Sequence, residues 1–236
     1  VTLLCVETRD PQLAHWASDR CLRETTFKNV VLITDLSRVS SQRSEIEYVQ
    51  APPISTTKDY SDFLLTGIDH YVKGSHVLII QWDSFITHPE LWRSEFLDYD
   101  YIGAPWPIPK DTFSYRDALG NIIRVGNSVS LRSKLMLELP QKLGLDWIDA
   151  DHGYFHEDGF LCVQHREILM RHGINFPPLS LACRFSRERS IPENRGVKPF
   201  AFHKWEGENR SFPRFTKRRT LLDIFKKMIA KYARSA

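Results

Sequence analysis

The sequence predicts an α/β fold in which helices flank a central sheet whose first strands are parallel. Short apolar runs alternate with segments of helical spacing through the first hundred residues, which is the pattern of strand–helix–strand crossover units. The chain has 236 residues, so it can bury a complete core within one domain. No internal repeat or linker-like segment divides it, and one domain is therefore the simplest organisation.

The chain begins with alternating strands and helices. Thr2–Val6 is an apolar strand, and Pro11 is a favourable first residue for a helix that continues to about Glu24. Val30–Thr34 is predicted as the next strand. Ile46–Val49 is a third, because the prolines that follow it force an extended connection.

A second helix leads into the most informative strand. Asp59–Tyr71 has apolar residues at helical spacing, and the run Val77–Ile80 after it is long enough for a buried strand and too short for a helix. Gln81, Trp82 and Asp83 follow this run. Because ligands collect beyond the carboxyl ends of strands in open α/β sheets, Asp83 is a candidate to meet a phosphate-bound metal or a substrate hydroxyl. The alternative is an aspartate that only caps the following turn.

The second half of the chain is less regular. Tyr99–Trp106 is dense in aromatic residues and ends in a proline-rich loop, and Gly120-Asn121 marks a hairpin-like turn. Ser133–Leu139 and Asp158–His172 are predicted helices, the second with a clear apolar face. Ala201–His203 is expected to close the body of the domain.

Composition excludes several classes of protein. The formal net charge of +3, without aromatic residues interleaved among the basic ones, argues against a nucleic-acid partner. The four cysteines are far apart and form no C-x-x-C pair, so neither a zinc ribbon nor a redox dithiol is indicated, and we expect a reduced, cytoplasmic setting. No apolar segment approaches the roughly 20 residues that span a bilayer.

The last residues form a region of their own. We expect the main domain at residues 1–216 and a basic amphipathic helix at residues 217–236, where apolar side chains from Leu221 to Tyr232 alternate with lysines and arginines. Such a helix either packs its apolar face on its own domain or binds an anionic surface. In the second case the protein would be peripheral at the inner membrane surface.

Four segments together carry a resemblance to a known family. They are QWD at Gln81–Asp83, VGNSVSLRS at Val125–Ser133, HEDG at His156–Gly159, and Phe202-His203. With the segment YDYIGAPW that ends at Trp106, the chain resembles DUF5672, a family of glycosyltransferase-like proteins, over about residues 2–205. This resemblance implies a GT-A fold: a mixed central sheet flanked by helices, whose Rossmann-like half binds a nucleoside-diphosphate sugar and whose second half receives a glycan acceptor.

The resemblance also implies a metal site. The Q-W-D element is similar to the D-x-D metal motif, so Asp83 would hold a divalent cation, Mn²⁺ or Mg²⁺, that neutralises the departing diphosphate. His203 is similar to the late histidine that supplies a further ligand. The alternatives are that Gln81 is only a strand residue that bonds its neighbours and that His203 is structural.

Two adjacent acids are the candidates for catalysis. Inverting sugar transfer needs a base that takes the proton of the acceptor hydroxyl. The resemblance places Asp158 as that base, and Glu157 as the group that hydrogen-bonds the sugar or acceptor. At the start of an apolar helix, the helix dipole would lower the pKa of a carboxyl and keep it ionised. The alternative is that both acids only cap the helix.

The nucleotide contacts are expected after the first strand and before the second helix. Thr8 and Arg9 follow the first strand, where base and ribose contacts are usual in such folds. Lys58 is placed to pair with a phosphate as a point charge, and Gln81 and Trp82 complete this donor side. Surface charge is the alternative explanation for Lys58.

The sequence therefore predicts a nucleotide-sugar-dependent glycosyltransferase, inverting and metal-assisted, that extends a cell-surface polysaccharide. A non-catalytic sugar- or nucleotide-sugar-binding module is the rival reading. It is supported by Gln81, which replaces an acid of the metal motif, and by Ser128-Val129, which replaces the double glycine and aromatic residue usual in the family.

Overall fold

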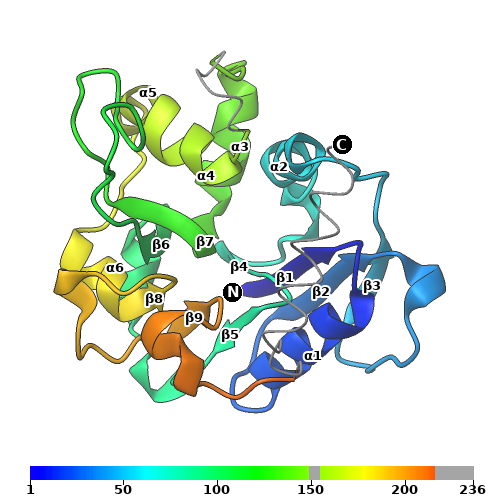
Figure 1. Ribbon diagram of the computed structural model, residues 1–236. Coiled ribbons are helices and arrows are strands. Elements are labelled where there is room, and N and C mark those ends of the chain that lie inside the picture. Colours follow the sequence, from blue (N-terminus) through cyan, green and yellow to red (C-terminus); the bar gives the residue numbers. More distant parts are fainter. Residues whose placement is uncertain (149–154, 216–236) are drawn as a thin grey trace, which may run out of the picture.

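A central mixed sheet organises the protein. The computed structural model describes residues 1–148 and 155–215, and within them the sheet has the strand order β3-β2-β1-β4-β7-β6 (Figure 1). The strands are β1 (Thr2–Glu7), β2 (Asn29–Thr34), β3 (Glu47–Gln50), β4 (His76–Ile80), β6 (Tyr101–Pro105) and β7 (Val125–Ser133). Strands β1 to β4 are parallel, and β7 runs antiparallel to both of its neighbours, β4 and β6. The predicted α/β class with a mixed sheet is confirmed.

The apolar runs of the sequence become the buried centre of this sheet. Leu4 of β1 pairs with Val31 on one side and with Ile79 on the other, and all three are at most 1% exposed. Strands covered on both faces need continuous apolar runs rather than alternation, which explains why these segments were recognisable.

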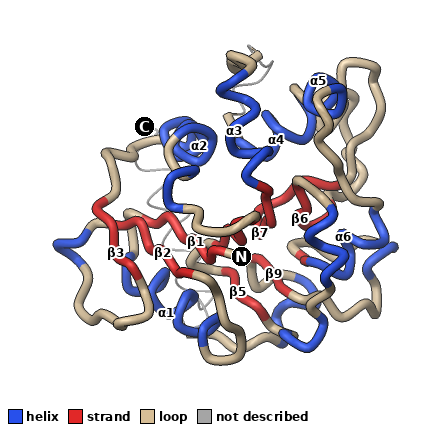
Figure 2. Tube along the Cα trace, turned by 180° about the vertical axis from the view of Figure 1, so that it is seen from behind, coloured by secondary structure: helices blue, strands red, loops and turns tan. Residues whose placement is uncertain are grey.

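Helices cover both faces of the sheet. They are α1 (Pro11–Leu22), α2 (Thr57–Thr66), α3 (Lys134–Lys142), α4 (Glu157–Gly159), α5 (Arg166–Arg171) and α6 (Leu179–Phe185). Figures 1 and 2 show α1 on one side and α2 to α5 on the other, while α6 packs on β6. The first helix begins at Pro11, as predicted, because Asp10 caps it by accepting the N–H of Leu13.

A second, small sheet links three distant segments. Its strands are β5 (Ser84–Ile86), β9 (Ala201–His203) and β8 (Ser186–Arg187), in the order β5-β9-β8. Ser84 pairs with His203 in antiparallel register, and Arg187 pairs with Phe202 in parallel register. This pairing brings together Asp83, which precedes β5, Glu188, which follows β8, and Lys204, which follows β9.

The second helix is shorter than its apolar pattern predicts. It starts at a capping box formed by Thr56 and Asp59 and ends at Thr66, after which Asp69–Tyr71 forms a separate 3₁₀ turn. Gly67 ends the helix: its N–H bonds the carbonyl of Phe63, and a Cβ at this position would lie 2.4 Å from the Phe63 ring.

The predicted helix Asp158–His172 is broken. Its first turn is α4, the segment Phe160–Gln164 is π-helical, and α5 follows. The break is at His165, whose N–H reaches back five residues to the carbonyl of Phe160 at 3.0 Å while its imidazole Nε2 lies 2.8 Å from the carbonyl of Asp146. One π turn lets α4 and α5 point differently, and such turns are frequent at functional sites.

The predicted tail helix at residues 217–236 lies outside the described residues. Among the described helices, none combines the length and the apolar character that crossing a bilayer would require.

Candidate functional site

A cavity of about 1030 Å³ lies beyond the carboxyl ends of the parallel strands. One wall is formed by the residues that follow β1, β3 and β4, from Glu7, Ile54 and Gln81 onward. The other walls come from the loop after β6, from α4 and from the ends of β8 and β9. This is the place where open α/β sheets bind their ligands.

Thr8 and Arg9 line the cavity, where the donor contacts were predicted. Their loop is folded by Glu7, whose carboxylate accepts the N–H groups of Arg9 at 2.6 Å and Asp10 at 3.2 Å. The Arg9 side chain is 84% exposed, so it can turn toward a ligand.

Lys58 does not line the cavity, which differs from its predicted role. Its ammonium lies 2.7 Å from the Asp62 carboxylate one turn further along α2, and it sits over the rings of Trp147 and Phe155. Its i,i+4 acidic partner and the two aromatic faces hold the Lys58 ammonium at α2 instead of in the cavity.

The three residues of the Q-W-D element do not all face the cavity. Gln81 and Trp82 line the cavity, whereas Asp83 does not. The Asp83 side chain is 13% exposed, and its Oδ1 lies 3.1 Å from Nε2 of His203. The register of β5 against β9 causes this approach, because Ser84 pairs with His203.

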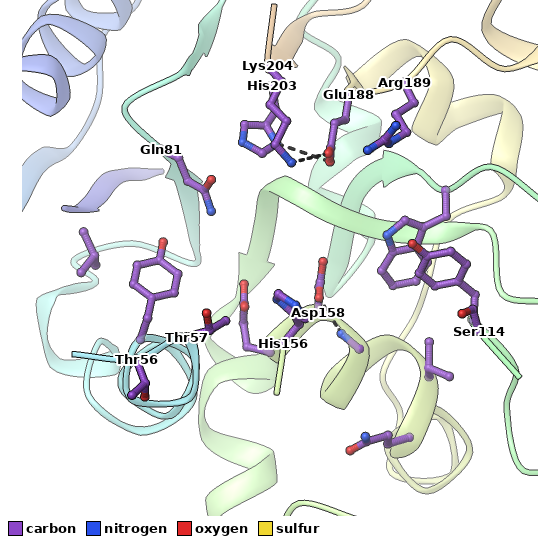
Figure 3. Close-up of a pocket in the computed structure, with 18 of the residues that line it drawn as sticks. Thr56, Thr57, Gln81, Ser114, His156, Asp158, Glu188, Arg189, His203 and Lys204 are labelled. Atoms are coloured by element: carbon purple, nitrogen blue, oxygen red, sulfur yellow. Dashed lines mark hydrogen bonds and ion pairs between the residues drawn. The ribbon is translucent and has the colours of Figure 1, made fainter. Parts of the chain in front are cut away.

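His203 belongs to a row of charged groups in which His203 and Glu188 are buried and Lys204 is half-buried (Figure 3). Its Nδ1 lies 3.3 Å from Glu188, and the other oxygen of that carboxylate lies 2.6 Å from the Lys204 ammonium. Burial alone would lower the pKa of His203, yet Asp83 and Glu188 raise it. Burial alone would raise the pKa of Glu188, but its bonds to His203 and Lys204 lower it to about 2. Three of these groups, Glu188, His203 and Lys204, also line the cavity.

Asp83 and His203 are the side chains that would hold a divalent cation, and in this structure they bond each other directly. Two ligands that each contact one cation at about 2.1 Å at right angles lie about 3 Å apart, and these two atoms are 3.1 Å apart. A histidine that ligates a metal usually turns its other ring nitrogen to a carboxylate, and Glu188 has this position. The described residues contain no cluster of three or more metal-ligating side chains, so phosphate oxygens and water would have to complete the coordination.

The two adjacent acids of α4 point to different partners. Glu157 is buried and its Oε1 accepts a hydrogen bond from the Arg132 guanidinium at 2.9 Å. Arg132 is 1% exposed and also donates to the Ser130 hydroxyl. Asp158 is half-buried, accepts the N–H of Gly159 at 2.7 Å and points into the cavity (Figure 3).

The pKa of Asp158 is shifted in the direction opposite to the prediction. Burial and the neighbouring charge of Glu157 raise it to about 8, although the Gly159 N–H and Arg132 act the other way. The predicted lowering assumed a long helix with a free N-terminus, whereas α4 has only three residues before the π turn. A carboxyl with this pKa can exchange a proton near neutral pH.

Sequence reasoning missed three charged residues of this region: Arg132, Glu188 and Lys204. Arg132 stands in the apolar-flanked run VSLRS, where a lone arginine on a buried strand signals an internal acid partner. Lys204 directly follows Ala201–His203, which the structure shows to be strand β9, so recognising that strand would have included it through the strand-end rule. Glu188 follows a strand of two residues, which is too short to be recognised from its sequence.

Two solved structures share this architecture. Mouse xyloside xylosyltransferase 1 in its apo form is 15% identical, and the match covers 90% of this chain and 100% of that one at a TM-score of 0.52. The galactosyltransferase LgtC in complex with donor and acceptor sugar analogues is 12% identical, and the match covers 90% and 92% at a TM-score of 0.51. The fold is a GT-A-like glycosyltransferase fold.

The chain belongs to the DUF5672 family, described as a protein of unknown function, whose model matches residues 43–203. This confirms the predicted family. No curated protein matches the chain. The roles of the individual site residues stay predictions.

Proposed function

We propose that this protein is a glycosyltransferase that moves a sugar from a nucleoside-diphosphate sugar to a glycan acceptor, with inversion and with help from a divalent cation. The observation that carries the proposal is the cavity itself. In a GT-A-like fold, this cavity is lined by His203, whose Nε2 lies 3.1 Å from Asp83, by the titratable Asp158 and by the cationic side chains of Arg189 and Lys204.

The donor side has the groups that a nucleoside diphosphate needs. Thr8 and Gln81 offer polar atoms to the base and ribose, and Trp82 offers an aromatic face. Arg189 and Lys204 bring positive charge to the wall near His203, where the diphosphate would lie (Figure 3). A divalent cation held by Asp83 and His203 would supply Lewis-acid neutralisation of the leaving diphosphate.

The acceptor side is centred on Asp158. As the acceptor oxygen forms its bond to the anomeric carbon, the carbon–oxygen bond to the diphosphate breaks and its electron pair leaves with the diphosphate. The acceptor proton passes to the ionised Asp158 carboxylate. Glu157 is fixed by Arg132 and holds α4 in place, so that Asp158 keeps its orientation.

The expected acceptor is a growing cell-surface polysaccharide, and we place the reaction in the cytoplasm. Contact of the 217–236 tail with the inner membrane surface stays part of this proposal. The net charge of +3 supports neither a nucleic-acid partner nor strong binding to other polyanions.

A non-catalytic nucleotide-sugar-binding module is the second candidate. Two observations favour it: Gln81 leaves a single carboxylate in the metal motif, and an Asp158 with a pKa of about 8 is mostly protonated at neutral pH.

Screening decides between the two functions. We expect native mass spectrometry of the protein with a panel of nucleotide-sugars to show binding of one donor and its slow hydrolysis, faster with Mn²⁺ than with EDTA. Binding without hydrolysis or transfer to any glycan would favour the binding module, and no binding of any donor would refute both.

Removing the Asp83 charge is expected to weaken nucleotide binding only when metal is present. Asp83→Asn should reduce the affinity for the nucleoside diphosphate about tenfold or more in Mn²⁺ and change it little in EDTA, because the lost oxygen contacts the cation rather than the nucleotide. Calorimetry measures both conditions. The exposed Asp69→Asn is the matched control, and equal binding by the unmodified protein with and without Mn²⁺ would remove the metal from the mechanism.

The rate of transfer is expected to rise with pH and to level off near pH 8. A base must be ionised to accept the acceptor proton, and the pKa of Asp158 is about 8. A plot of log kcat/KM against pH should therefore have a slope near 1 below this value and flatten above it. Asp158→Glu should shift the inflection, and a flat profile from pH 6 to pH 9 would show that no group with this pKa acts as the base.

A further inference from the structure

An aromatic layer forms the wall of the cavity beyond Asp158. The ring of Tyr115 stacks on Trp106, with centroids 4.6 Å apart and planes 15° apart. Trp106 is 3% exposed, and its ring edge rests on the backbone of Gly126, where a Cβ would lie 2.5 Å away. Trp106 is thus fixed from behind, and Tyr115 is the member of the pair that is half-buried at the cavity.

The backbone holds Tyr115 in place at some cost. Among the described residues, only Tyr115 and Lys204 are non-glycine residues with positive φ, at 54° and 62°, and both line this cavity. Such a conformation costs about 1 kcal/mol or more for a residue with a Cβ. The Tyr115 carbonyl accepts the N–H of Ile123 at 2.7 Å, which stabilises the turn. Strain at a cavity wall points to a side chain whose position matters for a ligand.

The Tyr115 ring lies within reach of the charged groups of the site. Burial, and then the negative charges of Asp158 and Glu188, raise the pKa of its hydroxyl. Figure 3 shows the neighbouring Ser114 on the wall across from Thr56 and Gln81, with Asp158 between them. Tyr115 follows Ser114 in the chain, so a ligand stacked on it lies on the wall opposite Thr56 and Gln81, next to Asp158.

We propose that Tyr115 is the platform for the acceptor sugar, a pyranose ring whose face of C–H groups stacks on the tyrosine and whose hydroxyl is then presented to Asp158. Aromatic faces carry partial negative charge, which suits the weakly positive C–H groups on one face of a pyranose. Stacking on Trp106 pre-organises the ring, so little conformational freedom is lost on binding. This inference rests on the proposed function, because it names the substrate class of the same site.

Saturation-transfer difference NMR with methyl β-D-galactopyranoside and methyl β-D-glucopyranoside tests the platform without a donor. We expect signals concentrated on the protons of one ring face. Tyr115→Phe keeps the aromatic face and should bind equally well. Tyr115→Leu keeps apolar bulk without that face and should lose about tenfold in affinity, which is about 1.4 kcal/mol. Tyr115→Gly removes the ring and relieves the positive φ, so it should fold and show the same loss.

The outcomes separate this inference from the proposed function. Tyr115-dependent pyranoside binding without transfer from any donor would leave the platform standing and refute the transferase. Transfer with an unchanged acceptor KM in folded Tyr115→Leu and Tyr115→Gly would refute the platform alone. Signals spread over both ring faces, or no pyranoside signal with the unmodified protein at millimolar concentrations, would also overturn it.

Discussion

Replacing Asp158 by asparagine is expected to lower the rate of sugar transfer by about 10² to 10⁴ while the affinity for the donor is unchanged. This is the usual contribution of general-base catalysis. The substitution is nearly isosteric and can keep the hydrogen bond with the Gly159 N–H. The lost group acts on the acceptor and in the transition state, so donor binding does not depend on it. Transfer rates and calorimetric donor affinities measure the two quantities.

Glu157→Gln is the matched variant one residue away, and it should be milder in turnover because Glu157 faces Arg132 rather than the acceptor. Activity retained in Asp158→Asn would refute the assignment of the base. Activity lost only in Glu157→Gln would move the base to that residue.

The same substitution should stabilise the fold. The pKa of Asp158 is about 8 in the folded chain and near its ordinary value of 3.8 in the unfolded chain. Between these values the unfolded chain releases this proton first, so wild-type stability falls as the pH rises from about 4 to 8. Asparagine carries no such proton. The melting temperature of Asp158→Asn should therefore exceed that of the wild type by a margin that widens over this range and vanishes below pH 4.

Replacing Arg132 by methionine is expected to destabilise the protein by about 3–5 kcal/mol, because it leaves the buried Glu157 carboxylate without its cation. Arg132 is 1% exposed and donates to both Glu157 and Ser130, so water cannot take its place without opening the core. Urea unfolding with the linear extrapolation measures the change.

Two further variants test the reason for this loss. The double variant Arg132→Met with Glu157→Met replaces both charges by apolar groups of similar size and should recover most of the stability. Arg171→Met is the matched control, because it breaks an exposed ion pair with Glu167 in which the Arg171 side chain is 68% exposed. It should lower the free energy of unfolding by less than about 0.5 kcal/mol. A loss below about 1 kcal/mol in Arg132→Met would show that the buried pair is not a strong constraint on α4.

The strands of the first half were predictable because their chemistry is local. A strand buried on both faces must be apolar along its length, as in Val77–Ile80, and this leaves an unmistakable pattern. The break in the predicted helix Asp158–His172 could not be predicted from the sequence. Its apolar spacing continues through the π turn, and the bond from the His165 imidazole to Asp146 depends on the tertiary fold.

Site residues that directly follow a strand could be predicted from the sequence. The contacts that these residues make with side chains distant in the sequence could not. Asp83 could be proposed from its strand end and His203 from the family resemblance, but their separation of 3.1 Å depends on the register of β5 and β9. The direction of the Asp158 pKa could not be predicted, because it depends on how deeply a three-residue helix is buried. The pairing of Lys58 with Asp62 could not be predicted either, because it depends on which of several acids the flexible lysine side chain meets in the fold.

The parallel pairing of β8 with β9 has a consequence for how this site can change in evolution. Because Arg187 pairs with Phe202, the next residues in register are Glu188 and His203, and the connection between the two strands does not set their separation. Residues can be added to or removed from that connection at low entropic cost. A single residue inserted between Arg187 and Glu188 would instead turn the carboxylate to the opposite face. In homologous proteins, insertions and deletions should therefore be found between Arg189 and Phe200 and be rare in the strands on either side of this connection.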